Sequence, residues 1–223
     1  MLGRLAAVIL LPFMLQAMPA SAMVMDVVDN QLIMSGAVVS GDYFNITSLL
    51  DRNSQVDTVV VRNSPGGHAF TGFGIGAIIR ARKLNTVVSG YCRSACSRIF
   101  LGGVERRFAA DTPPGQTYVA FHGNYDDSGR LNISNIETLR KYVIDYSDGK
   151  ADIELVKRWT VIPNTSGYIY FFDPHRLNRK DGISVFLCQG TEKKKYEDCE
   201  KIAGKTGFDV GVYTSTELVK PNK

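Results

Sequence analysis

One serine, one histidine and one glycine pair have the residue types that acyl-transfer chemistry requires. Ser94 stands in the small-residue segment Gly90-Tyr-Cys-Arg-Ser-Ala-Cys-Ser97, about 27 residues after Gly67 and about 28 residues before His122. A serine hydroxyl becomes a useful nucleophile when a base accepts its proton, and histidine is the usual base because its pKa lies near neutrality. The oxyanion that follows needs backbone N–H donors, and glycines let a backbone approach that closely.

Each feature taken alone has a more common structural explanation. A Pro-Gly-Gly sequence usually forms a turn, and a serine before an apolar helix usually caps that helix. His68, directly after Gly67, is typical of a loop, and His175 after Asp173-Pro174 is typical of a turn. Lys83 and Lys141 are the lysines that could serve a Ser-Lys dyad, and no motif supports either of them. The joint order of the glycines, Ser94 and His122 is what favours a site.

Strands and helices alternate along the chain. Runs of β-branched residues predict buried strands, and apolar residues at helical spacing predict helices between them. The predicted strands are residues 31–35, 58–61, 86–88, 118–121, 168–172 and 208–213, and the predicted helices are residues 41–50, 73–83, 94–101 and 133–159, the last broken near 147–149.

This alternation predicts an α/β domain built from parallel βαβ units with right-handed crossovers. Ligands of such sheets gather outside the carboxyl ends of the strands. The Gly66-Gly67 loop, the Ser94 turn and His122 each follow a predicted strand. We therefore expect all three at one edge of the sheet.

The first 22 residues have the pattern of a secretory signal peptide. Arg4 supplies the positive charge, residues 5–15 are apolar, and Ala20-Ser-Ala22 fits a cleavage site. An uncleaved anchor is the alternative, because no further charge precedes Asp26. We expect a mature protein of residues 23–223 in the periplasm or secreted, with a core at about 31–182 and a cysteine-bearing extension at about 183–223. We expect no membrane span after cleavage.

Four cysteines in an exported chain predict two disulfides. Three pairings are possible, and proximity favours Cys92–Cys96 and Cys188–Cys199. The first pair would brace the turn that carries Ser94. A four-cysteine zinc site is the alternative, but the spacings fit it poorly, so we expect no metal.

Composition narrows the range of functions. The net charge of +4 is too small, and the basic residues too scattered, to indicate a nucleic-acid partner. No Gly-x4-Gly-Lys-Ser/Thr motif is present, so the chain brings no ATPase of its own. We expect no cofactor.

The motifs together resemble the proteolytic subunit of the Clp protease, ClpP. The matching residues are Asn63-Ser-Pro-Gly-Gly67, Gly90 four residues before Ser94, Gly102-Gly103 with Arg106-Arg-Phe108, and the strand that ends at His122. The resemblance covers about residues 31–122 and fades after them. It implies the ClpP/crotonase fold, a spiral of ββα units with a parallel sheet. The Gly-x-Cys-x-Ser-Ala-Cys form is more similar to exported relatives than to the cytoplasmic enzyme.

The resemblance also assigns roles to residues. Ser94 matches the nucleophile, His122 the base, and Gly67 and Ala95 the donors of the oxyanion hole. The position of the family's third member, an aspartate, holds Tyr170 here, and Asp173 three residues later is the candidate substitute.

Three functions remain open at this point. The first is an ATP-independent serine peptidase that acts through an acyl-enzyme on short or unfolded peptides. The second is a catalytically inactive peptide- or acyl-binding protein, which the missing aspartate suggests. The third is a crotonase-type thioester enzyme, against which export away from coenzyme A argues. The resemblance further implies self-association into a homo-oligomer.

Overall fold

The computed structural model describes residues 22–177, 179–194 and 196–222. The predicted signal peptide, residues 1–22, lies outside the described residues except for Ala22. Among the residues described, no helix is long and apolar enough to cross a membrane.

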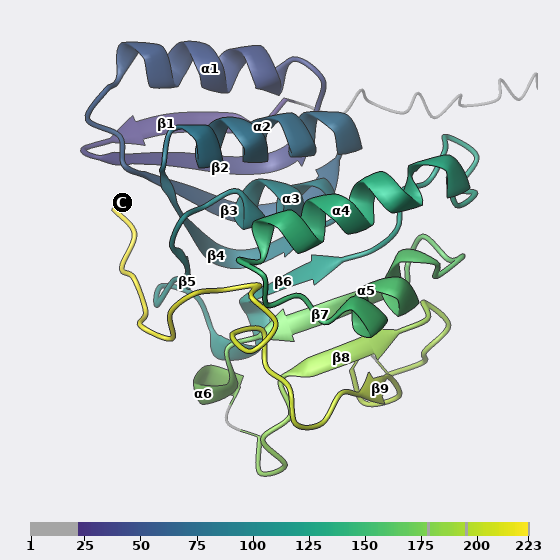
Figure 1. Cartoon of the computed structure of the whole chain (residues 1–223). Helices are drawn as coiled ribbons and strands as arrows, with labels where there is room; N and C mark the ends of the chain where they lie inside the picture. Colours follow the sequence, from purple (N-terminus) through teal and green to yellow (C-terminus); the bar gives the residue numbers. More distant parts are fainter. Residues whose placement is uncertain (1–21, 178, 195, 223) are drawn as a thin grey trace, which may run out of the picture.

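A nine-stranded mixed sheet runs through the molecule (Figure 1). Its order is β1-β2-β3-β4-β6-β7-β8-β9, and β5 pairs with β4 beside this path. The strands are β1 Val24–Val28, β2 Gln31–Val38, β3 Thr58–Gly67, β4 Asn85–Arg93, β5 Arg106–Phe108, β6 Tyr118–Phe121, β7 Tyr168–Phe172, β8 Val185–Cys188 and β9 Glu200–Lys201.

Strand direction divides the sheet into two parts. The pairs β2–β3, β3–β4, β4–β5 and β4–β6 are parallel, as the βαβ pattern predicts. The strands β7, β8 and β9 and the N-terminal β1 pair antiparallel with their neighbours. The sheet is therefore mixed and not wholly parallel.

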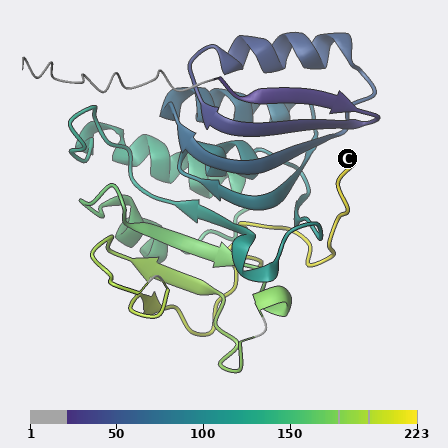
Figure 2. The same cartoon turned by 180° about the vertical axis from the view of Figure 1, so that it is seen from behind.

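Five helices cover one face of the sheet (Figure 1). The opposite face of the sheet is open to view from behind (Figure 2). The five helices are α1 Asp42–Arg52, α2 Ala69–Ala81, α3 Ala95–Leu101, α4 Ile136–Tyr146 and α5 Ile153–Thr160; a short α6, Pro174–Leu177, follows β7. The main core lies between these helices and the sheet. Helix α3 is its centre, since every side chain of α3 is buried.

Close packing of α2 against α3 holds that central helix in place. A Cβ added at Gly76 would lie 2.5 Å from the Arg98 carbonyl oxygen and 2.0 Å from the Tyr142 hydroxyl. Any larger residue there would push the two helices apart. Because α3 begins at the residue after Ser94, this contact also fixes the turn that carries Ser94.

The opposite face of β6, β7 and β8 has its own aromatic cluster, which we call the aromatic face. Its buried rings are Tyr118, Tyr170, Phe172 and Phe186. Tyr196, from the segment after β8, lies over it with ring centroids 5.0–6.3 Å away. The Cys188–Cys199 disulfide closes this segment, and Cys92–Cys96 forms as well, so both predicted pairings are confirmed.

The C-terminal segment completes the fold, although not as predicted. Residues 208–213 form turns and not a strand, because Gly207 and Gly211 break an extended path: the Val212 N–H returns to the Gly207 carbonyl at 2.7 Å. Val212 and Tyr213 are nevertheless part of the main core. Further on, Val219 pairs with Ala109 beside β5.

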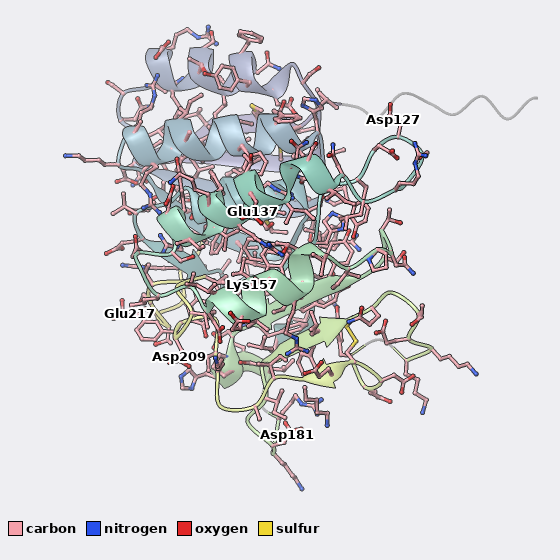
Figure 3. The ribbon with its side chains drawn as sticks, turned by 45° about the vertical axis from the view of Figure 1, so that its right-hand side comes forward. Asp127, Glu137, Lys157, Asp181, Asp209 and Glu217 are labelled. Atoms are coloured by element: carbon pink, nitrogen blue, oxygen red, sulfur yellow. A yellow bond between two sulfur atoms is a disulfide. The ribbon has the colours of Figure 1, made fainter. Side chains whose placement is uncertain are left out.

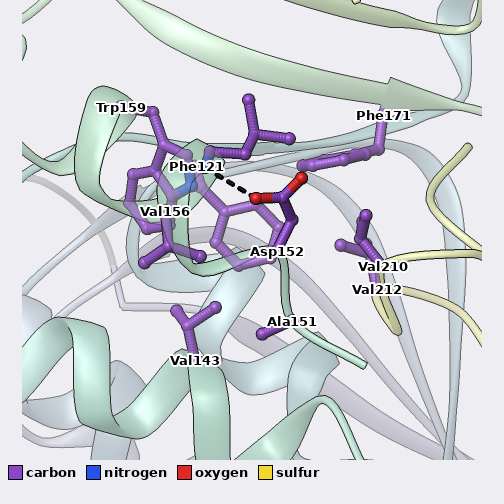
Figure 4. Close-up of a pocket in the computed structure, with 10 residues that line it drawn as sticks. Phe121, Val143, Ala151, Asp152, Val156, Trp159, Phe171, Val210 and Val212 are labelled. Carbon is purple, nitrogen blue, oxygen red and sulfur yellow. Dashed lines mark hydrogen bonds between the residues drawn. The ribbon is translucent and has the colours of Figure 1, made fainter. Parts of the chain in front are cut away.

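A small void lies beneath α5 among Phe121, Trp159, Phe171 and their apolar neighbours (Figure 4). Its volume is about 20 Å³, space for a single water molecule. The Asp152 carboxylate at its border accepts the Leu155 N–H at 3.0 Å and so caps α5. The void is a feature of core packing and not a ligand site.

Candidate active site

Ser94 lies at the junction of β4 and α3 with an unusual backbone conformation. Its φ is 54° and its ψ is −124°, values that non-glycine residues seldom adopt. The Ser94 N–H donates to the Ala120 carbonyl of β6 at 3.0 Å, and the Cys92–Cys96 disulfide closes the turn around it. A strained strand-to-helix turn of this kind lifts a serine Oγ out of the sheet edge, where a substrate can reach it.

His122 directly follows β6 and meets that hydroxyl. Its Nε2 atom lies 2.7 Å from the Ser94 Oγ, within hydrogen-bond distance. The two residues are held by neighbouring parallel strands, with Arg93 of β4 in register with Ala120 of β6. The structure therefore brings together the predicted nucleophile and the predicted base.

The glycine pair lies against the nucleophile turn. A Cβ at Gly66, whose φ is +88°, would be 2.6 Å from the Ser94 Cβ and 2.8 Å from the Ala95 nitrogen. Only glycine leaves the approach to the Ala95 amide open. The His68 N–H donates to the Val38 carbonyl on the β2 side, so the amide of Gly67, one residue earlier in an extended chain, faces away from β2.

An open cleft of about 610 Å³ joins these groups. Ser94, His122, Gly67 and Thr165 line it together with the exposed ring of Phe70. The loop after β6 forms its outer wall, and Asp127 on that loop projects away from the body of the molecule (Figure 3).

The environment of His122 favours its neutral form. Burial lowers its pKa from 6.5 to about 3, and the positive charges of Arg98 and Arg93 add to this effect. Arg98 is itself buried: its Nη2 donates to the His122 carbonyl at 3.3 Å and to the Asn124 Oδ1 at 2.7 Å. Among the described residues, neither arginine forms an ion pair that would offset its charge.

No carboxylate orients the imidazole. The buried Nδ1 of His122 has no hydrogen bond of standard geometry within the described chain, and the Thr165 backbone carbonyl is the group that faces the ring and raises its pKa. Tyr168 stacks on the imidazole with centroids 4.3 Å apart and planes at 12°. A carbonyl and an aromatic ring thus contact the imidazole at the place where a Ser-His-Asp triad has a carboxylate.

The loop that carries Thr165 is itself anchored. The Tyr125 hydroxyl donates to the carbonyls of Ile162 and Asn164 at 2.8 and 3.0 Å. The Asn164 side chain reaches the Gly190 carbonyl at 3.2 Å. These bonds fix the position of the carbonyl beside His122.

Asp173 does not join the site, so its prediction as the third member is wrong. In the β6–β7 register Phe121 pairs with Ile169 and Tyr118 with Phe172, which puts Asp173 beyond the far end of β7. Four residues of strand, about 13 Å, separate it from the level of Phe121. Its carboxylate instead accepts the His175 N–H at 2.9 Å and begins α6.

The rival residues have structural roles. His68 caps α2: its Nδ1 lies 2.8 Å from the Thr71 hydroxyl, although the residue also lines the cleft. His175 belongs to α6, and Lys141 pairs with Asp145 on α4 at 2.7 Å. Lys83 follows the far end of α2, about 20 Å from its first residue.

A metal site is not formed by the cysteines. Ligand atoms of Cys188, Glu192 and Cys199 lie within 4.8 Å of one another. The disulfide occupies both sulfur atoms, and the Glu192 oxygens accept the N–H groups of Gln189 and Gly190.

Three residues beside His122 were not predicted from the sequence as part of the site: Arg98, Thr165 and Tyr168. Arg98 left one signal, since it is the single charged residue in the otherwise apolar or small stretch Ala95–Leu101. Thr165 acts through its backbone, which no side-chain pattern can reveal.

Comparison with solved structures identifies the fold. ClpP1 from Listeria monocytogenes superposes with a TM-score of 0.50 at 14% identity, over 87% of this chain and 93% of that chain. A variant of the same protein gives a TM-score of 0.51, also at 14% identity, over 86% and 92%. The fold is that of ClpP. It confirms the predicted α/β class.

Other comparisons are more distant. A variant of the 1510-N membrane-bound stomatin-specific protease, solved with a substrate peptide, is similar at a TM-score of 0.43 and 15% identity, over 58% of this chain and 64% of that chain. No protein-family model matches the chain, and no curated protein matches its sequence. The ClpP-like fold is therefore established, and the activity has to be argued from the site.

The disulfide that encloses Ser94 gives a first prediction. Replacing Cys92 and Cys96 with alanine frees the strained turn, and we expect labelling of Ser94 by a fluorophosphonate to slow by about tenfold to a hundredfold. The loss of unfolding free energy should be about 2 kcal/mol, the chain-entropy value for so short a loop.

The matched control replaces Cys188 and Cys199 with alanine. It removes a disulfide of a longer loop, at a cost of about 3 kcal/mol, but leaves the nucleophile turn intact. Equal slowing of labelling in both double variants would show that the Cys92–Cys96 bond has no special relation to Ser94.

Burial of a neutral His122 predicts a loss of stability in mild acid. The unfolded state takes up a proton below pH 6.5, whereas the folded state resists protonation until about pH 3. The free energy of unfolding should therefore fall by about 1 kcal/mol for each pH unit from pH 6 to pH 5. Urea unfolding at these pH values measures the slope, and His122→Gln should lack it. The same slope in His122→Gln would contradict the assignment.

Proposed function

We propose that this chain is an exported serine hydrolase that cleaves short or unfolded peptides through an acyl-enzyme on Ser94, without ATP. The observation that carries the proposal is the 2.7 Å contact between the Ser94 Oγ and the His122 Nε2 at the floor of an open cleft. A nucleophile within hydrogen-bond distance of a neutral base is the first geometric requirement of such catalysis.

The chemistry follows from the positions of the groups. His122 Nε2 accepts the proton of the Ser94 hydroxyl while Oγ attacks the substrate carbonyl carbon. The N–H groups of Gly67 and Ala95 donate to the oxyanion that forms. The imidazolium returns its proton to the leaving amine, and a water molecule then releases the acyl group from Ser94 by the same steps in reverse.

The surroundings of His122 set the expected rate. The imidazolium has no carboxylate beside it, and loss of the orienting aspartate can cost about 10⁴ in rate. Arg93 and Arg98 oppose the imidazolium but favour the negative charge on the substrate oxygen. We therefore infer a slow hydrolase whose main catalytic contribution is stabilisation of the oxyanion.

The proposed compartment and substrate rest on other features. Two disulfides suit an oxidising environment, which agrees with the signal peptide expected at residues 1–22. The absence of an ATPase motif from the sequence favours peptides that are already unfolded. Assembly into a homo-oligomer stays a prediction.

A second function is favoured by one observation. The Nδ1 of His122 lacks a carboxylate partner among the described residues, which is what a catalytically inactive relative would show. Such a protein would hold a peptide or acyl group in the same cleft, with the Gly67 and Ala95 amides on its carbonyl oxygen.

Labelling with a fluorophosphonate separates the two functions. We expect the oxidised protein of residues 23–223 to form a covalent adduct, and intact-mass measurement with peptide mapping should locate it on Ser94. Ser94→Ala should abolish the adduct. His122→Ala should slow its formation by about 10² to 10⁴, the contribution of general-base catalysis.

Two neighbouring variants serve as controls. Ser97→Ala removes a hydroxyl one helical turn away, which donates to the Ser94 carbonyl at 2.6 Å, and His68→Ala removes the other histidine of the cleft. Both should still form the adduct. A well-folded parent that does not react would overturn the hydrolase and support the binding protein.

A further inference from the structure

Arg93, the residue immediately before Ser94, has a guanidinium without a charged partner among the described residues. It is half-buried, and it makes no hydrogen bond or ion pair with any described residue. Its Nε is fully buried and unpaired, and the guanidinium lies over the Tyr91 ring in a cation–π interaction, 4.8 Å from the centroid. Arginines are seldom buried without a partner, so this one is poised to receive an anion.

The register of the sheet places this cation beside the catalytic pair. Arg93 of β4 pairs with Ala120 of β6, which in turn pairs with Tyr170 of β7. These three side chains share the aromatic face, because directly paired residues project from the same side of a sheet. His122 lies two residues beyond Ala120, directly after the end of β6. By the alternation of an extended chain it projects from the same face as Ala120, about 7 Å farther along.

A groove continues past Arg93 along the same face. It has a volume of about 500 Å³, and Asn63, Tyr91, Gly115, Gln116, Tyr118 and Tyr196 line it. Tyr91 is two residues before Arg93, again about 7 Å away. Arg93 stands in the chain between Tyr91, which lines this groove, and Ser94, which lines the cleft with His122.

The carboxylates nearby do not neutralise the cation. Glu192 is close enough to act on Tyr170, but both of its oxygens accept backbone N–H groups of its own turn. Arg98, which has no ion pair among the described residues, is fully buried and donates a hydrogen bond to Asn124, so its guanidinium is out of reach of a substrate.

We propose that Arg93 is a specificity residue that binds a carboxylate of the substrate within three residues of the scissile bond. The inference rests on the proposed hydrolase and names its substrate class, which is acidic peptides. The carboxylate can come from a glutamate or aspartate side chain or from the free C-terminus of the peptide. A bound carboxylate also offsets one of the two positive charges that oppose the imidazolium of His122, so the preferred substrate assists its own cleavage.

The test compares matched peptides with the oxidised enzyme. Glutamate is placed at each of the three positions on either side of the scissile bond and compared with glutamine at that position, and each peptide is made as the free acid and as the amide. We expect one position to show kcat/KM about tenfold to a hundredfold higher for the acid, the range of one charged hydrogen-bonded contact. A preference confined to free-acid peptides assigns the C-terminal carboxylate, and one confined to glutamate assigns the side chain.

Variants separate a binding role from an effect on the base. Arg93→Gln should remove the preference for the glutamate or free-acid peptide over its neutral counterpart, and Arg93→Lys should retain part of that preference. A loss that is equal for acidic and neutral peptides would overturn the proposal, because it would reflect structure or the basicity of His122. Arg82→Gln is the control, since Arg82 pairs with Asp51 at the end of α2 remote from the site, and it should keep the full preference.

Measurements of peptide binding test the role of Arg93 independently of whether the protein is a hydrolase. The Kd values of the glutamate and glutamine peptides for Ser94→Ala are measured with and without Arg93→Gln, which requires no turnover. Preferential binding of the acid that Arg93→Gln abolishes supports the subsite even where the parent does not react with fluorophosphonate. Equal Kd values for the charged peptides (glutamate or free acid) and their neutral counterparts (glutamine or C-terminal amide) in Ser94→Ala would contradict the proposed role of Arg93.

Discussion

The hydrogen bond from the Ser94 N–H to the Ala120 carbonyl is the contact on which the site depends. This bond lies at the end of the parallel pairing of β4 with β6. It ties Ser94 to Ala120, and His122 follows Ala120 by two residues. The buried helix α3, the Cys92–Cys96 disulfide and the glycines of α2 and β3 all hold this junction. Because the turn is strained, none of its neighbours can relax without moving the Ser94 hydroxyl away from His122.

The electrostatics of the site differ from those of an ordinary Ser-His-Asp triad. Two arginines stand near His122, and a backbone carbonyl and a stacked tyrosine hold the ring where an aspartate would be expected. This arrangement keeps the base neutral and charges the site positively. It weakens proton transfer but favours every negative species at the site, both the oxyanion and an acidic substrate. One set of contacts therefore accounts for the inferred slow rate and for the inferred specificity.

Much of this could be predicted from the sequence, because the signals were local. β-Branched runs marked β3 and β4, glycines marked the loop, and the order of strands implied that Ser94 and His122 meet. The predictions that the structure contradicts depended on contacts between residues far apart in the sequence. Asp173 was chosen by its distance along the chain, whereas the antiparallel turn of β7 carries it away from His122. The Thr165 carbonyl belongs to the backbone, which no side-chain pattern reveals. Residues 208–213 contain strand-forming residues, but Gly207 before them and Gly211 among them turn the chain back on itself.

The protonation state of the His122 imidazole decides whether Nε2 can accept the Ser94 proton. Nitrogen NMR of histidine-labelled protein between pH 8 and pH 5 measures it, with the His122 signals assigned by their loss in His122→Gln. We predict a neutral ring throughout, with its proton on Nδ1 toward the Thr165 carbonyl and Nε2 free to accept the Ser94 proton. Protonation with a midpoint between pH 6 and pH 7, or a neutral ring that carries its proton on Nε2, would contradict the account.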